Sequence, residues 1–416
     1  MSARPFSLMI FVALLALTMV GEGMITVTLL WTSASLGHSP MFIGLVLFVM
    51  NIVPFLAQLV FRPLRAAIAD QPLRMIILPR MAGVAVVLFA AQAFSAAHLG
   101  LLVAVACCLT FITFISQQCL ETLMGQWTVA GLVDAQTSAR LSQTALQSGV
   151  FVGNALAGLM IDHFGTAMVF VGIGASFACS LLLPLAAPNV IGDRPFRGQA
   201  AASRQDEKGA AGRKDAVLWG LLLAMGVLAV QLSGFNVFVP LIFQHRSAEA
   251  AALYGIVSAA AGSGALLATL IPARAGQRYS YAACCAVVVG DAMVTRAGPV
   301  ALTLGYAFAI GFGFNTARIR IRQAMFERLD SKAQSALWGG RVTLTFRAMT
   351  AGAPLLFALM MRDTAVIDRG FLFAAIGLLT MGLFVPLVLF LARRSACDAP
   401  SVPSIRPVAA RPGPPE

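Results

Sequence analysis

The sequence predicts an all-α membrane protein from three observations: its composition, the spacing of its apolar segments and the placement of its basic residues. Hydrophobic residues make up 59% of the 416 residues, and charged residues only 11%. A soluble globular protein carries about 25% charged residues, which it needs for its surface. Because a membrane-spanning helix needs about 20 apolar residues, a chain of this length can form about a dozen such helices.

The apolar segments fall into two groups of six, separated by a polar stretch. The first group lies at residues 6–32, 41–61, 75–97, 99–120, 141–161 and 166–187, and the second at 216–243, 251–272, 279–296, 298–317, 338–361 and 370–392. Residues 188–214 carry six basic residues among Gly and Ala, a composition typical of a flexible linker. We therefore predict an N-terminal six-helix bundle (1–187), a cytoplasmic linker (188–214), a C-terminal six-helix bundle (215–392) and a disordered, Pro-rich tail (393–416).

Basic residues are distributed unevenly between the two sides of the membrane. If the N-terminus is cytoplasmic, the external loops hold only Arg246, Arg296, Arg362 and Arg369, and nearly all other basic residues lie inside. This bias follows the positive-inside rule and places both termini in the cytoplasm, with the chain in the inner (cytoplasmic) membrane. The net charge of +12 then reflects membrane topology, and we expect no nucleic-acid partner.

A short repeat indicates that the two halves are related. Residues 134–139 (DAQTSA) precede the fifth segment, and residues 330–336 (DSKAQSA) precede the eleventh, roughly 197 positions later. Parallel repeats of this kind are typical of a transporter built from two bundles.

The loop after the second segment resembles the loop motif of the major facilitator superfamily, G-x-x-x-D-R-x-G-R, and a degenerate copy follows the eighth segment. The matching positions are Asp70 and Arg74 in the first copy and Arg274, Gly276 and Arg278 in the second. The first copy lacks both glycines and one arginine of the motif, and the second lacks its acid. The resemblance implies a fold of twelve helices in two six-helix bundles, and a cytoplasmic gate in which the acid meets a helix N-terminus and basic residues of the other bundle.

The fifth segment contains a glycine pattern that resembles the antiporter motif G-x-x-x-G-P-x-x-G-G. Gly149, Gly153 and Gly158 match, whereas Asn154 and Ala157 replace a Pro and a Gly. The resemblance favours export over uptake. The alternative is ordinary helix packing, because small residues four apart let helices approach closely.

Glu22 stands out among the ionisable residues within the apolar segments, where such groups are costly and therefore functional candidates. From Phe6 it lies about 24 Å along the first helix, in the outer half, at about 1.5 Å per residue. Thr18 and Thr26, four residues to either side, extend one polar stripe. Because burial favours the neutral form of a carboxyl, Glu22 is a candidate to load and release a proton. The alternative is a solvated glutamate at the outer interface.

Further polar residues within the segments are candidates for lining a substrate cavity. Arg347 is the sharpest basic candidate, since it lies well inside the eleventh segment; the alternative is an internal pair with an acid such as Glu22. Glu121, one turn after Gln117, is either a second proton or substrate group or an interfacial glutamate. Asp291, near the outer end of the ninth segment, is expected at the interface. The remaining candidates are Arg140, Gln143, Gln147 and Asn154 in the fifth segment, Gln231 and Asn236 in the seventh, and Asn315 and Arg318 in or just after the tenth.

The sequence carries no P-loop, no G-x-S-x-G elbow, no H-E-x-x-H motif and no paired Cys/His site. We therefore expect no enzyme activity, no cofactor and no metal. The leading hypothesis is a monomeric, proton-coupled exporter of a small organic molecule, whose partners are that substrate, protons and the lipid bilayer. The arginines among the candidates favour an anionic substrate, such as a carboxylate or hydroxamate siderophore. The alternatives are a proton-coupled uptake symporter of an organic anion, a multidrug efflux pump and, more remotely, a non-transporting scaffold or sensor.

Overall fold

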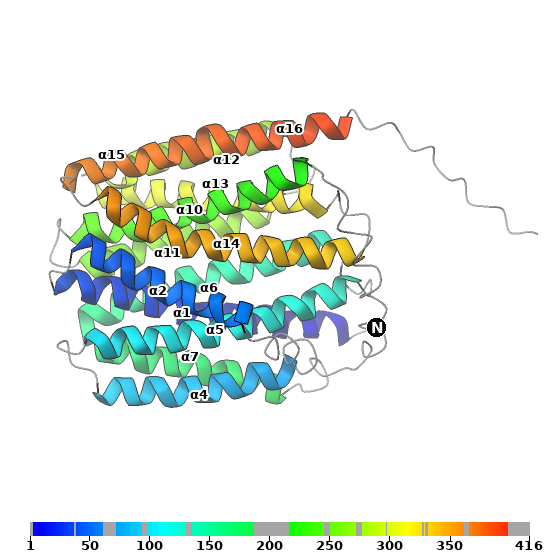
Figure 1. Ribbon diagram of the computed structural model, residues 1–416. Helices are drawn as coiled ribbons and strands as arrows, with labels where there is room; N and C mark the ends of the chain where they lie inside the picture. The colour runs from blue at the N-terminus through cyan, green and yellow to red at the C-terminus, as the bar shows by residue number, and fades with distance from the viewer. Residues whose placement is uncertain are drawn as a thin grey trace, which may run out of the picture.

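Nearly parallel helices make up the described part of the protein, as a computed structural model shows (Figure 1). The structure describes residues 3–36, 39–60, 72–93, 99–129, 133, 135–186, 216–244, 250–271, 277–296, 298–326, 328, 332–361 and 366–397. The expected linker (188–214) lies outside these ranges and remains a prediction. The last helix continues through Cys397, so the tail expected from residue 393 begins later, and residues 398–416 lie outside the described part.

The two halves of the chain lie side by side, the N-terminal half below and the C-terminal half above in Figure 1. The helices of the first half are α1 (Ala3–Ser35), α2 (Pro40–Val60), α4 (Pro72–Ala93), α5 (Leu99–Val129), α6 (Ala135–Phe164) and α7 (Thr166–Ala186). Those of the second half are α10 (Ala216–Gln244), α11 (Ala250–Thr269), α12 (Gln277–Val294), α13 (Val300–Phe326), α14 (Lys332–Met360) and a last rod made of α15 (Val366–Gly377), the π-helix η1 (Leu378–Phe384) and α16 (Val385–Cys397).

Ten helical spans in the described part are long and apolar enough to cross a membrane, which makes this a multi-pass membrane protein. The last rod counts as one of these spans. Helices α12 and α14 are more polar. Helix α12 begins with a polar turn that includes Arg278, and the part of α14 before Leu344 contains Lys332 and Arg341, so the apolar part of α14 is the shorter stretch Leu344–Met360. Each of the twelve predicted segments still falls on a helix, so the predicted all-α, twelve-helix class is confirmed.

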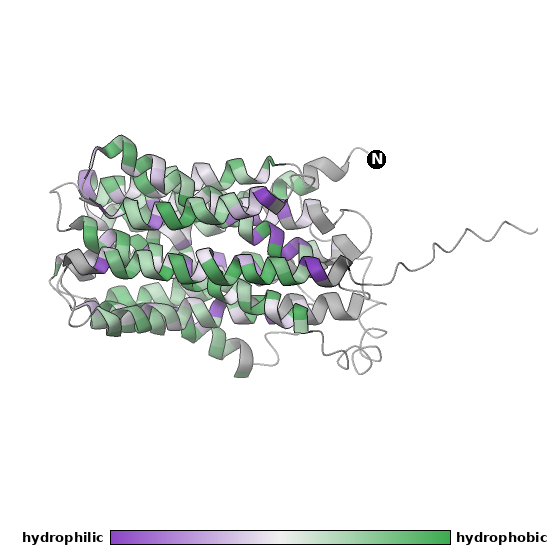
Figure 2. Cartoon of the chain, turned by 90° about the horizontal axis from the view of Figure 1, so that it is seen from above, coloured by the Kyte–Doolittle hydropathy of each residue, from purple (hydrophilic) through white to green (hydrophobic). Residues whose placement is uncertain are grey.

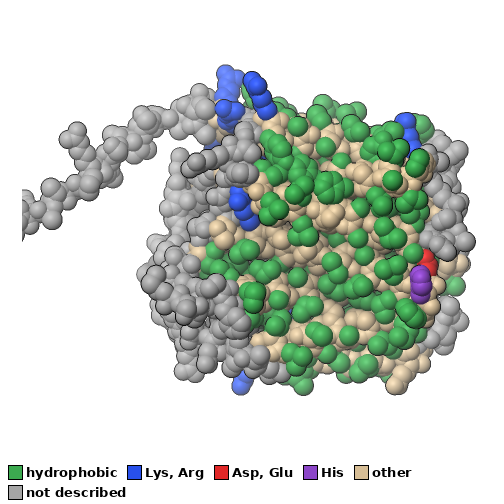
Figure 3. Space-filling view, turned by 180° about the vertical axis from the view of Figure 1, so that it is seen from behind, with side chains coloured by type: hydrophobic (Ala, Val, Ile, Leu, Met, Phe, Trp, Pro, Cys, Tyr) green, Lys and Arg blue, Asp and Glu red, His purple; other side chains and the backbone are tan. Residues whose placement is uncertain are grey.

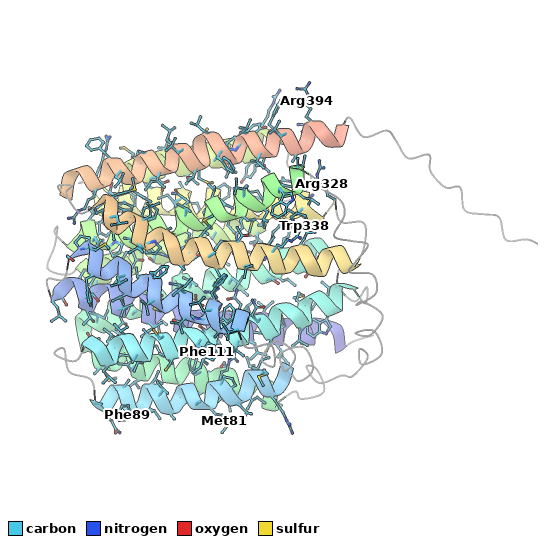
Figure 4. The ribbon with its side chains drawn as sticks, viewed as in Figure 1. Met81, Phe89, Phe111, Arg328, Trp338 and Arg394 are labelled. Atoms are coloured by element: carbon cyan, nitrogen blue, oxygen red, sulfur yellow. The ribbon has the colours of Figure 1, made fainter. Side chains whose placement is uncertain are left out.

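The outer surface of the helices is apolar along most of their length. Met81 and Phe89 of α4 point away from the molecule (Figure 4) and are 57% and 60% exposed. On the face shown in Figure 3, Lys and Arg side chains lie mainly at one end, which we call the terminal end because α1 begins and α16 ends there. Hydrophilic residues within the helices also gather toward this end (Figure 2). The apolar band between the two ends is therefore the surface that suits lipid.

Helices α6 and α11 join the two halves and are held together at both ends of α11. At its start, Asp162 Oδ2 of α6 accepts a hydrogen bond from Ala252 N at 2.7 Å. Just after its C-terminal end, Ile271 O accepts a hydrogen bond from Arg140 Nη2 of α6 at 3.1 Å. An acid thus meets the N-terminal end of α11 and a base its C-terminal end, the signs that the helix dipole favours. We call this arrangement the α6–α11 clamp.

Glycines allow the helices at the centre to approach to backbone contact. Gly149 and Gly153 of α6 lie against the α1 backbone at Ala16 and Val20, and Gly158 lies against Ala251 of α11. The glycine pattern of the fifth segment is therefore used in close packing, the alternative that the sequence left open beside the antiporter motif.

Four helices extend further toward the terminal end than their apolar segments indicate. Helices α5 and α13 continue past the expected ends at 120 and 317, and α6 and α14 begin before the expected starts at 141 and 338. Hydropathy underestimates the length of these helices because the turns nearest the terminal end, at the ends of α5 and α13 and at the starts of α6 and α14, are more polar. The ends Val129 and Phe326 are 197 positions apart, as are the starts Ala135 and Lys332, which matches the spacing of the short repeat.

We expect Gly153→Ala to destabilise the protein, because the new methyl group would meet the Val20 backbone, which cannot rotate away. Overpacking of this kind costs about 1–3 kcal/mol. Gly352→Ala in α14 is the matched control, since nothing lies within 4 Å of its added Cβ. Thermal unfolding of the purified protein in detergent should show a lower Tm for Gly153→Ala only. Equal Tm values for the two variants would contradict the close α1–α6 contact.

Candidate functional site

A cavity lies between the two halves and encloses about 1120 Å³ when its open mouth is included. Helices α1, α2, α5 and α6 of the first half and α10, α13 and α14 of the second contribute to its wall. Its polar lining residues are Glu22, Thr26, Asn51, Gln117, Gln147, Asn154, Ser233, Asn236, Arg318, Arg322, Arg347 and Thr350. A concave site with a few converging polar groups, on the boundary between two structural units, is the usual form of a small-molecule site.

Arg347 of α14 connects the two halves across this cavity. Its Nη1 lies 3.0 Å from Glu22 Oε1 of α1 and forms an ion pair with it. Its Nη2 donates to Gln117 Oε1 of α5, and its guanidinium lies 5.6 Å from the ring centre of Phe114. The sequence had left this pairing open as an alternative for Arg347, and the structure contains it. Glu22 and Arg347 side chains are 17% and 11% exposed, so the pair lies at the surface of the cavity and is not sealed behind its lining.

Small neighbours allow α1 to place Glu22 at the cavity. Gly21 lies against the ring of Phe177 of α7, and Gly23 against Val150 O of α6. With these helices packed so closely on either side of Glu22, its carboxylate faces α14. Glu22 Oε2 is buried and has no hydrogen-bond partner among the described residues, so one carboxylate oxygen can still accept a proton or a hydrogen bond.

The cavity is richer in positive than in negative charge. Arg318, Arg322 and Arg347 line it, and Glu22 is the one acid among the described residues that line it. The Arg318 guanidinium stacks at 4.5 Å from the ring centre of Phe346, which also lines the cavity. Arginine combines a permanent charge with a planar fork of donors, so a wall of this kind attracts carboxylates and other planar anions.

Three other predicted residues line the cavity as expected: Gln147, Asn154 and Asn236. The amide nitrogen of Asn154, in the orientation that satisfies it, donates to Gly23 O at 3.1 Å and to Val150 O at 3.3 Å. Asn154 therefore joins α6 to α1 beside Glu22. The Oδ1 atom of Asn236 is buried without a hydrogen-bond partner.

Four predicted residues do not line this cavity, and that prediction was wrong for them. Arg140 belongs to the α6–α11 clamp, and Asn315 donates to Ala265 O of α11 at 2.7 Å. Gln231 bonds to Asp291 and Thr380 within the second half. Gln143 is fully buried, and neither of its amide atoms has a partner. Helical spacing placed these residues on polar stripes, but neighbouring helices cover parts of each stripe.

The remaining predicted residues fall at the edge of the described part or outside it. Glu121 lies inside α5 rather than at its end, and its side chain is not among those described. Arg74 and Arg278 are exposed in the first turns of α4 and α12. Asp70, Arg274 and Gly276 lie outside the described residues, so the gate remains a prediction.

Sequence reasoning did not predict the burial of two ionisable residues, Arg80 and Asp291. Arg80 of α4 is completely buried; it donates to Thr18 of α1, while its Nε and Nη1 atoms have no partner. Thr18 therefore faces α4, away from the cavity, unlike Thr26. Asp291, expected at the interface, is also completely buried, because α10 and the last rod extend past it. The available signal was a charge inside an apolar segment, which is costly and rarely incidental.

The fold matches those of known transporters. The nucleoside transporter NupG superposes with a TM-score of 0.62 at 13% identity, covering 95% of this chain and 99% of that chain. A mutant form of NupG gives 0.63 at 15% identity, covering 94% and 99%. The expected resemblance is thereby confirmed at the level of the fold: the chain has the major facilitator fold.

Sequence comparison is more limited. A segment of 139 residues is 26% identical to a multi-drug resistance efflux pump PmrA homolog of Lactococcus lactis subsp. lactis (strain IL1403). The match covers 33% of this chain and 34% of that protein, so it spans about a third of the relative's length. No protein-family model matches the chain.

We expect Glu22→Gln and Arg347→Gln to be coupled in their effects on stability. Each single variant leaves the other charge near the cavity without its partner, so the double variant should be less destabilised than the sum of the two. Groups in one ion pair show coupling energies of about 0.5–3 kcal/mol. The measurement is a double-mutant cycle on thermal or denaturant unfolding. Glu22→Gln with Arg341→Gln is the control and should be additive, since Arg341 instead stacks on Trp219 and Trp338. Additivity in the first cycle would refute the pairing.

Proposed function

We propose that this protein is a secondary transporter that carries a small organic anion across the membrane and binds it at Arg347. The observation that carries this proposal is the Arg347–Glu22–Gln117 cluster, which joins both halves at the cavity between them. In a carrier of two bundles, the substrate site lies at the boundary of the bundles, and rocking of one against the other exposes it to each side in turn. The arginine-rich lining supports an anionic substrate.

The Glu22–Arg347 pair supports coupling to a proton. In the structure the carboxylate of Glu22 occupies the guanidinium of Arg347. A proton on Glu22 removes the charge that holds Arg347 and frees its donors for a substrate carboxylate. Anion and proton thus favour each other's binding, because each relieves the same ion pair. A carrier that binds both together moves them in the same direction, which is symport.

Export by proton antiport is the second candidate. It was the leading expectation from the glycine pattern, and the similarity to a named efflux pump supports it. Antiport requires the substrate and the proton to compete for one group. A cationic substrate that binds Glu22 would meet that condition, whereas an anion at Arg347 would not. The glycine pattern no longer favours either direction, since packing against α1 and α11 accounts for its three glycines.

The α6–α11 clamp suggests where the two halves move. Because this contact is tied at both ends of α11, we place the axis of rocking along it. Across the cavity, Gly44 of α2 touches the α14 backbone at Pro354 and Leu355, at the end opposite the terminal end. We infer that this α2–α14 contact closes the opposite end and opens when the halves rock. The loops at Asp70 and Arg274 are the proposed gate for the terminal end. We propose that this end faces the cytoplasm, and that the protein acts as a monomer in the inner membrane.

We expect Arg347→Gln to lower the affinity for the substrate so far that cells no longer transport it at their ordinary substrate levels. Loss of a charge-assisted hydrogen bond costs about 1.5–3 kcal/mol, or about a tenfold to hundredfold loss in affinity for the substrate. Metabolites inside cells and in their medium should be compared for cells that lack the protein, carry it, or carry a variant. Cells with Arg347→Gln should match cells that lack the protein. Arg341→Gln, on the same helix but away from the cavity, should match the unaltered protein. Full transport activity of Arg347→Gln would contradict the proposed anion site.

The direction of proton movement separates the two candidates. Proteoliposomes that hold a pH-sensitive dye are given the anion whose level changes in the cell comparison. For symport, the added anion should acidify the interior, and Glu22→Gln should remove the acidification. Alkalinisation of the interior would instead establish antiport. No pH change with intact substrate flux would exclude proton coupling altogether.

A further inference from the structure

Asp291 lies in the interior of the second half, outside the cavity. It is completely buried, and its Oδ2 accepts a hydrogen bond from Gln231 Nε2 of α10. Gln231 Oε1 in turn accepts from Thr380 Oγ1 of η1 at 3.0 Å. Gly377, the last residue of α15, leaves the space that the carboxyl occupies, since a Cβ there would collide with Oδ2. Three helical rods therefore meet around one acid.

No positive charge compensates this acid in the described part of the protein. Helix α10 and η1 contain no charged residue at all. Asp291 forms no ion pair with any described residue, and its Oδ1 has no hydrogen-bond partner. The titratable groups on its own helix and on the elements packed against it are Arg278, Tyr279, Tyr281, Cys284, Cys285, Arg296, Tyr306, Arg318, Arg320, Arg322, Asp368, Arg369, Arg393, Arg394 and Cys397. An ionised carboxylate without a partner is costly inside a membrane protein, so the neutral form is favoured.

A proton suits this position better than a metal ion. Hard cations need about six or more oxygen ligands in a close shell. Here Gln231 turns its N–H toward Asp291 and its oxygen toward Thr380, whose single hydroxyl proton is shared between Gln231 Oε1 and Ile376 O, 2.7 Å away. Only the two carboxylate oxygens remain. One of them, Oδ1, is without a partner and is where a proton can bind.

The cluster is connected to the cavity through α10. Gln231 directly precedes Leu232 and Ser233, which line the cavity, and Asn236 lines it about one turn later. On the other side, Thr380 lies in a π-helical segment, a form that is rare and occurs frequently at functional sites. The charge on Asp291 decides whether Gln231 must donate to it. It thereby affects how firmly the cavity wall at α10 is held against α12.

We propose that Asp291 is a proton-binding site within the second half, separate from the cavity, and that Gln231 transmits its protonation state to the α10 wall. At neutral pH the proton resides on Oδ1, and its loss leaves a carboxylate that depends on Gln231 and tightens the contact between α10 and α12. The use of this proton in transport rests on the proposed function, whereas the proton site itself does not.

Infrared spectroscopy tests the site without any substrate. The full-length protein, labelled with ¹³C at aspartate carboxyls and held in lipid nanodiscs, is titrated with base from neutral pH. We expect a labelled band of a protonated carboxylic acid at neutral pH that disappears at high pH. Asp291→Asn should lose the band. Asp162→Asn and Glu22→Gln should keep it, since those acids lie in the clamp and the cavity. Absence of the band in the unaltered protein, or its survival in Asp291→Asn, would overturn the proposal.

Further controls test whether the band reports Asp291 in the folded protein. Asn is nearly isosteric with Asp and can still bond to Gln231, so Asp291→Asn should keep the Tm of the unaltered protein. Gly377→Ala keeps the aspartate but crowds its carboxyl, so it should shift the frequency of the band. The titration is repeated in sodium chloride and in choline chloride. Loss of the band in sodium alone would show a cation site and overturn the proton assignment. Because neither measurement involves transport, failure of the proposed function leaves this test intact, and failure here leaves the cavity proposal intact.

Discussion

The Glu22–Arg347 ion pair is the interaction on which the central organisation of this protein depends. It joins α1 to α14 across the boundary of the two halves, and Gln117 adds α5 to the same centre. Inside a membrane an arginine needs a partner, so the pair satisfies a cost that either residue alone would impose. Because the pair borders a cavity, the proposed function places the binding of a proton to Glu22 and of an anion to Arg347 here. In that proposal one contact both joins the two halves and binds the transported species.

The rest of the interface between the halves includes two contacts that are held in different ways. Along α6 and α11, backbone contact through glycine combines with charges of the sign that suits each end of α11. This combination resists separation along the whole helix. The α2–α14 contact is made at Gly44 by small-residue packing, with the cavity next to it. A two-bundle carrier needs such an asymmetry, since one seam must hold while the other opens.

Each half also contains a buried ionisable residue on its third helix that bonds to its first helix. In the first half Arg80 donates to Thr18, and in the second Asp291 accepts from Gln231. One residue is basic and the other acidic, and they occupy different depths of their helices. The polar bond between the first and third helices thus recurs in the two halves, although the residues that make it do not. Both bonds lie behind the cavity wall, where they brace α1 and α10.

Composition, the spacing of apolar segments and the placement of basic residues were sufficient to predict the fold class, because the need to satisfy every backbone hydrogen bond in lipid leaves few architectures for such a chain. They also predicted several residues of the cavity, since Glu22, Gln147, Asn154, Asn236, Arg318 and Arg347 are polar groups within apolar segments. The sequence could not separate these from Gln143, Gln231 and Asn315, which share the same helical stripes. Only the packing of neighbouring helices decided which part of each stripe faces the cavity. It likewise turned Asp291 from an expected interfacial residue into a buried one, because burial depends on how far the adjacent helices extend.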